Sequence, residues 1–162
     1  MKNIFLFCLS LLLCGCSLGH YEYIRDNSKA DITKEEYSIS LFDYVDSYQL
    51  IVYNKSKDDI EIDWNKTSFI RDGRIDGNFM FEGIKYIDRN NPKNPTIVMS
   101  ETNQSIRIYP NNLVYFSSGR YGGWRNNDIP DGENGIYLVF TQGKKEFREK
   151  LLINRITQYV KD

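Results

Sequence analysis

The alternation of apolar and polar residues is the feature that most constrains the fold of this chain. It is clearest in Asp59–Trp64, where Ile60, Ile62 and Trp64 alternate with acidic residues. Apolar residues at every second position share one face of a β-strand, and the polar residues between them face the other way. We therefore expect a strand with one face in water, and we expect Trp64 to lie in the core rather than to stack against a ligand.

The same alternation returns in short segments that are separated by turn residues. Further strands are expected at Tyr37–Val45, Tyr48–Tyr53, two or three places within Phe69–Ile87, Thr96–Met99, Ser105–Tyr109, Leu113–Phe116 and Ile136–Thr141. Many short strands without a long helix predict an all-β fold, an antiparallel β-sandwich of immunoglobulin-like type. A small β-barrel is the second choice. This single domain is expected to cover residues 37–162.

The C-terminal stretch from residue 146 leaves two patterns open. Phe147 and Leu151 match one face of a strand, with Glu149 as an exception, but the same stretch also matches the apolar stripe of a helix. The short sequence at 142–145 is typical of a hairpin turn. We therefore expect a returning strand, with fraying or a brief helix beyond Asn154.

The first residues of the chain differ in composition from the rest. Lys2 is followed by Ile4–Leu13, an apolar run of about ten residues. This run is shorter than the ~20 residues that a membrane-spanning helix needs. A short positive start followed by such a run is typical of a cleaved secretion signal, so residues 1–15 are expected to be removed.

The end of this segment resembles the lipobox of bacterial lipoproteins. Leu13-Cys14-Gly15-Cys16 has an aliphatic residue, a variable one, a small one and then a cysteine, although Cys14 is a mild departure at the variable position. The resemblance implies cleavage before Cys16, a diacylglyceryl thioether on its sulfur and usually an acyl group, such as palmitate, on its new amine. Two or three chains hold a protein firmly on a membrane, because each buried methylene contributes about 0.8 kcal/mol.

The residues after Cys16 bear on where the anchored protein is placed. In Gram-negative lipoproteins an Asp in the next position is the usual signal for retention in the inner membrane, and Ser17 stands there instead. The resemblance therefore implies the outer membrane if the source is Gram-negative. Residues 16–36 carry little apolar periodicity and are expected to form a lipidated tether, which as a flexible chain spans about 25 Å.

Composition excludes several classes of function. The chain has 21 Lys and Arg against 22 Asp and Glu, and no basic run that could bind phosphates, so nucleic acid is not an expected partner. His20 is the only histidine, and all three cysteines lie within the first sixteen residues. A Ser-His-Asp or Cys-His catalytic set, a zinc site and an internal disulfide are therefore excluded from the folded body. We expect a protein that is not an enzyme and has no cofactor.

Acidic residues near Gly73 and Gly77 invite comparison with calcium loops. Asp72, Asp76 and Asn78 lack the ligand order and the distal Glu of a helical calcium loop. Asp-Gly pairs favour turns that need positive φ angles. We interpret these residues as turn residues and predict no metal site.

The segment Ser117–Gly135 is predicted to be a long loop rich in glycine. Loops of this length inside a compact domain are uncommon, and many of them are functional. Its candidate binding residues are Arg120, Tyr121, Trp124 and Arg125, because these residue types contribute most to binding energy at protein interfaces. The alternative is that Trp124 folds back over the open end of the sandwich.

Two classes of function remain. The first is a lipid-anchored binding or scaffold module of the cell envelope, which contacts a protein partner. The second is a glycan-binding envelope lipoprotein that uses exposed aromatic side chains. A flat exposed platform at Tyr121 and Trp124 would favour glycans, whereas a protruding knob ringed by arginine would favour protein contacts.

Replacing Cys16 by serine is expected to abolish acylation, because the thioether requires a thiol. Metabolic labelling with a palmitate analogue should mark the wild-type protein and leave the Cys16→Ser variant unmarked. A variant that keeps the label would contradict the lipobox interpretation.

Overall fold

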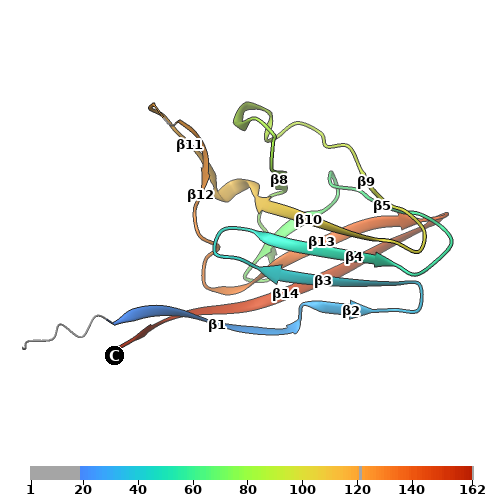
Figure 1. The fold of residues 1–162 in the computed structure, drawn as a ribbon, viewed down its shortest axis with the longest axis horizontal. Helices are drawn as coiled ribbons and strands as arrows, with labels where there is room; N and C mark the ends of the chain where they lie inside the picture. Colours follow the sequence, from blue (N-terminus) through green and yellow to red (C-terminus); the bar gives the residue numbers. More distant parts are fainter. Residues whose placement is uncertain (1–18, 121, 162) are drawn as a thin grey trace, which may run out of the picture.

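The computed structural model describes residues 19–120 and 122–161, which form two antiparallel β-sheets packed face to face (Figure 1). Neither sheet closes into a barrel. The prediction of an all-β antiparallel sandwich is therefore confirmed. Within the described ranges, no helix is long and apolar enough to cross a membrane. The predicted signal and Cys16 lie outside these ranges.

The first sheet is built around one long strand, β13. The sheet has the order β1-β14-β13-β5-β9, and β6 also pairs with β13 and carries β7 on its other edge. Its strands are β1 (His20–Lys29), β5 (Ile60–Ile62), β6 (Ser68–Arg71), β7 (Arg74–Ile75), β9 (Thr96–Val98), β13 (Gly132–Gln142) and β14 (Lys145–Val160).

The second sheet has the order β2-β3-β4-β10-β8. Its strands are β2 (Asp31–Thr33), β3 (Tyr37–Asp43), β4 (Tyr48–Asn54), β8 (Phe79–Phe81) and β10 (Asn103–Pro110). A separate hairpin consists of β11 (Val114–Ser117) and β12 (Gly123–Asn126), and two short 3-10 helices, η1 (Tyr86–Asp88) and η2 (Asn111–Leu113), lie in the connections.

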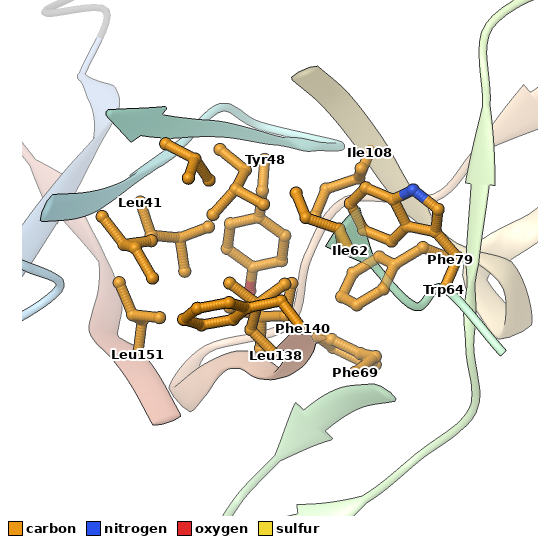
Figure 2. Packing of buried hydrophobic residues seen from close by; sticks show 14 of the residues in the cluster. Leu41, Tyr48, Ile62, Trp64, Phe69, Phe79, Ile108, Leu138, Phe140 and Leu151 are labelled. Carbon is orange, nitrogen blue, oxygen red and sulfur yellow. The ribbon is translucent and has the colours of Figure 1, made fainter. Parts of the chain in front are cut away.

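The core lies between the two sheets, where the alternating apolar residues of both point inward (Figure 2). Trp64 is buried there, and its Nε1 donates a hydrogen bond to the Thr96 hydroxyl at 2.8 Å, which confirms the expected core position. Glu149 is the exception in the inward face of β14. Its carboxylate accepts a hydrogen bond at 2.5 Å from the hydroxyl of Tyr37, whose ring packs edge-on against Phe140. Burial, together with Glu149, raises the pKa of Tyr37.

Two predicted turns are confirmed. Gly143 has φ +59° in the connection between β13 and β14, which pair as the expected hairpin. Asp72 and Gly73 both have positive φ angles, 48° and 77°, between the paired residues Arg71 and Arg74. This is the backbone that a two-residue hairpin turn requires.

The expectation of a brief helix or fraying beyond Asn154 is wrong. β14 continues as a strand to Val160, because β1 pairs with it from His20↔Val160 onward. For the same reason the expectation of a flexible tether is wrong over residues 20–33, which form β1 and β2. Main-chain hydrogen bonds hold β1, and its mostly exposed side chains produce no apolar periodicity.

The expectation of a loop throughout Ser117–Gly135 is also wrong. β12 lies inside this segment and pairs with β11, and β13 begins at Gly132. The first four residues of β13 are Gly132, Glu133, Asn134 and Gly135, so this part of the strand lacks the apolar alternation from which strands were predicted. At Gly135 an added Cβ would lie 2.0 Å from the Leu151 carbonyl oxygen, so the close approach of β13 to β14 requires a residue without a side chain.

Candidate functional site

The β11–β12 hairpin is the candidate site, since it belongs to neither sheet and projects away from the sandwich (Figure 1). Its register places Phe116 opposite Trp124 and Tyr115 opposite Arg125. Adjacent residues of a strand point to opposite faces. Each face of the hairpin therefore carries at least one aromatic side chain.

The structure places three of the four predicted binding residues on this hairpin. Arg120 and Arg125 are exposed, and the Nη1 of Arg125 donates a hydrogen bond at 3.1 Å to the carbonyl of Trp124. Trp124 is half-buried, and its ring meets that of Tyr109 edge-on with 5.1 Å between centroids. Tyr121 lies outside the described residues.

A small apolar cluster outside the main core supports the hairpin. Its buried members are Met80, Tyr109 and Val114, and Ile84, Tyr86 and Trp124 pack against them. Met80 and Tyr109 alternate with core residues of β8 and β10, so this cluster covers the outer face of the second sheet. The hairpin thus rests on the sandwich through the side chains of Val114 in β11 and Trp124 in β12.

A shallow groove of about 500 Å³ lies beside the hairpin. It is lined by Lys85, Tyr86, Ile87, Arg89 and Phe116. The guanidinium of Arg89 lies 4.1 Å from the centre of the Tyr86 ring, which itself contacts Phe116. Apolar and cationic side chains, some exposed and some half-buried, therefore line the surface between the hairpin and the η1 segment.

The sequence patterns did not predict the most exposed apolar side chains of this surface. Tyr115 and Phe116 were expected in an ordinary strand, and Ile87 at the end of a strand region, yet all three are exposed. Two consecutive aromatic residues were the available signal. In a strand with one buried face, at least one of such a pair must point to water.

The base of the hairpin is fixed to the β3–β4 turn. Asn126 donates a side-chain hydrogen bond to the Asp46 carboxylate at 3.2 Å, and the backbone N–H of Ile129 donates to the Val45 carbonyl at 2.8 Å. Arg107 of β10 adds a further contact, because its Nη2 donates to the hydroxyl of Ser47 at 3.0 Å. The C-terminal end of the hairpin is therefore held to the β3–β4 turn by polar contacts.

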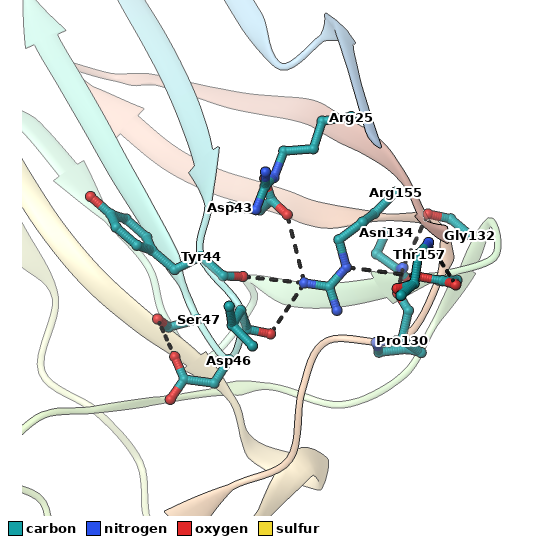
Figure 3. Close-up of polar contacts among 12 residues, drawn as sticks. Arg25, Asp43, Tyr44, Asp46, Ser47, Pro130, Gly132, Asn134, Arg155 and Thr157 are labelled. Atoms are coloured by element: carbon teal, nitrogen blue, oxygen red, sulfur yellow. Dashed lines mark hydrogen bonds and ion pairs between the residues drawn. The ribbon is translucent and has the colours of Figure 1, made fainter. Parts of the chain in front are cut away.

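The same turn receives a buried arginine from β14 (Figure 3). The side chains of Arg155 and Asp43 are each 3% exposed, with 3.8 Å between Nη1 and Oδ2. Arg155 also donates hydrogen bonds to the carbonyls of Val45 at 3.2 Å and Tyr44 at 3.4 Å. We call the contacts of Arg155 with Asp43 and the β3–β4 turn the Arg155 junction.

Two further charged groups balance this junction. Arg25 of β1 lies 2.6 Å from the Asp43 carboxylate, and Asp131 lies 4.0 Å from the Nε of Arg155. Hydrogen bonds from the N–H and the hydroxyl of Thr157 lower the pKa of Asp131, which keeps this carboxylate charged. Two arginines and two aspartates thus meet, and their charges cancel.

The described residues contain no group of three or more His, Cys, Asp or Glu side chains that could hold a metal ion. The arrangement is suited to binding through an exposed hairpin and its neighbouring groove. No protein-family model, curated protein or solved structure matches this chain.

Trp124→Ala is expected to destabilise the protein by ~2 kcal/mol, about half of what a fully buried aromatic contributes, because Trp124 is only half-buried. Phe116→Ala, which removes a more exposed ring from the opposite strand, should change the free energy of unfolding by less than about 0.5 kcal/mol. Urea denaturation of both variants measures the difference. Equal losses would contradict the packing described for Trp124.

Proposed function

We propose that this chain is a lipid-anchored binding module of the cell envelope and that its β11–β12 hairpin contacts a protein partner. The observation that carries this proposal is that the hairpin stands outside both sheets and exposes aromatic and arginine side chains. These residue types contribute most to the energy of protein interfaces.

The form of the hairpin favours a protein partner over a glycan. Sugar stacking requires an open, flat aromatic face, whereas Trp124 is half-buried and packed edge-on against Tyr109. Arg120 and Arg125 flank the aromatic residues on a projecting ribbon. A knob of this form fits a concave protein surface.

The support beneath the hairpin also favours binding. Binding costs free energy when flexible side chains and loops must be ordered. Here the cluster under Trp124 and the contacts to Val45 and Asp46 hold the hairpin in place before any partner arrives. Such a surface loses less conformational freedom when it binds.

The proposed anchor is the acylated Cys16, and it restricts the partner to the envelope. Cys16 precedes His20, the first residue of β1, by only four positions. The folded domain would therefore stay close to the membrane, which we propose is the outer membrane in a Gram-negative source. A partner would be a protein of that membrane or of the space beside it.

Site-specific photocrosslinking in cells tests the protein-binding proposal. A photoreactive phenylalanine analogue replaces Phe116, which is 56% exposed, or as a matched control Phe42, which is 49% exposed on the outer face of β3. We expect a discrete crosslinked protein band from position 116 and none from position 42. The band should weaken when Arg125→Glu is added, since Arg125 lies on the other face of the same hairpin and its reversed charge would oppose a partner that encloses both faces.

Other outcomes would reject the role of the hairpin. Crosslinks of equal intensity from both positions would indicate nonspecific contact, and their absence from position 116 would remove the hairpin as a protein-binding site. Retention of the protein on envelope polysaccharide, lost only when hairpin aromatics are replaced, would favour the glycan-binding alternative.

A further inference from the structure

The sandwich has a second projecting element, the end of the two-stranded ribbon formed by β1 and β14. Residues of β14 pair with β13 only up to Arg155, and beyond it residues 156–160 pair only with β1. This ribbon extends past the rest of the sandwich, at the end where the blue and dark red strands meet (Figure 1). It carries the first described residues of the chain.

Four large apolar side chains are exposed at this end. Tyr21 is 69% exposed, and the other three, Ile24, Ile156 and Tyr159, are each about half exposed. Tyr21 and Tyr159 are opposite each other and pack edge-on, with 5.2 Å between centroids. Ile24 and Ile156 form the next apolar pair along the ribbon.

These two pairs lie on opposite faces of the ribbon. Tyr21 and Ile24 are three positions apart, and the register between them is regular, so their side chains point to opposite sides. Docking on a flat protein surface would cover one face of the ribbon and leave the other pair in water. Immersion of the ribbon end in a layer that surrounds it covers both.

We propose that the end of the β1–β14 ribbon lies in the headgroup layer of the membrane, in contact with phospholipid. This inference rests on the proposed acylation of Cys16, which would lie at the boundary between headgroups and acyl chains. His20 follows Cys16 by four positions, and four extended residue steps reach at most about 14 Å. The headgroup layer on one side of a bilayer is itself about 5–7 Å thick.

The chemistry of the ribbon end fits this layer. Tyrosine is enriched at membrane interfaces, because its ring is apolar and its hydroxyl is polar. Charges of both signs accompany the apolar residues, including Glu22, Arg25 and Asp26, and Glu22 accepts a contact of 3.0 Å from the His20 ring. Binding of the ribbon end to the membrane would therefore depend on burial of its apolar side chains in the headgroup layer, and little on salt or on anionic lipid.

The cysteine content of the chain permits a clean test. Cys8 and Cys14 belong to the predicted signal and Cys16 is the proposed acylation site, so a cysteine introduced into the body is the single free thiol of the processed protein. Tyr159→Cys places a nitroxide label on the ribbon end. Ile97→Cys is the matched control, because Ile97 on β9, at the opposite edge of the same sheet, is 47% exposed against 52% for Tyr159.

Each acylated protein is placed in vesicles of phosphatidylethanolamine and phosphatidylglycerol, and the accessibility of its label to oxygen and to a water-soluble nickel chelate is measured. We expect the ratio of oxygen to nickel accessibility to be several-fold higher at position 159 than at position 97. Adding Ile24→Asp should return the ratio at position 159 to the aqueous value.

Equal ratios at the two positions would overturn the inference. Dipolar broadening between labels at position 159 would also overturn it, because it would indicate pairing of two copies along β1. Mass spectrometry of the N-terminal peptide separates the two proposals. An unmodified Cys16 rejects the lipid anchor, whereas an acylated Cys16 with an aqueous label at position 159 rejects only the ribbon contact.

Discussion

The buried guanidinium of Arg155 joins three segments that are far apart in the sequence. It lies on β14, pairs with Asp43 at the end of β3, donates to carbonyls of the β3–β4 turn and approaches Asp131 ahead of β13. A buried charge costs several kcal/mol unless partners compensate for it. These contacts offset part of that cost, although Arg155 Nε and Asp43 Oδ2 make ion pairs without hydrogen bonds, and they require the segments to meet in one arrangement.

Both projecting elements start from this junction. The Val45 carbonyl accepts hydrogen bonds from Arg155 and from the N–H of Ile129, which follows the β11–β12 hairpin. Arg25, the neighbour of Arg155 in the ribbon register, binds the same Asp43 carboxylate. The position of the proposed protein-binding hairpin and that of the proposed membrane-contacting ribbon therefore depend on one cluster of charges.

Apolar alternation was sufficient to predict the all-β sandwich and the inward faces of its main strands, because those faces are buried. It could not reveal β1, whose partner β14 is distant in the sequence, or β12, which is only four residues long and begins with a glycine. Arg155 lies on the same inward face of β14 as Leu151 and Ile153. Nothing in the sequence around Arg155 indicates that Asp43 lies opposite it. Composition alone indicated Arg120, Trp124 and Arg125 as candidate binding residues. The exposure of Phe116 could not be predicted in this way, because it results from the position of the hairpin outside both sheets.

Amide hydrogen exchange in an Arg155→Met variant tests whether Arg155 fixes the base of the hairpin. The exchange rate of Ile129, whose N–H is bonded to Val45, is compared with that of Asn54, whose N–H is bonded to Thr102 at the other end of β4. We expect exchange at Ile129 to accelerate at least about tenfold, a loss of roughly 1.4 kcal/mol in local stability, while Asn54 stays protected. Unchanged exchange at Ile129, or equal acceleration at both amides, would contradict this role of Arg155.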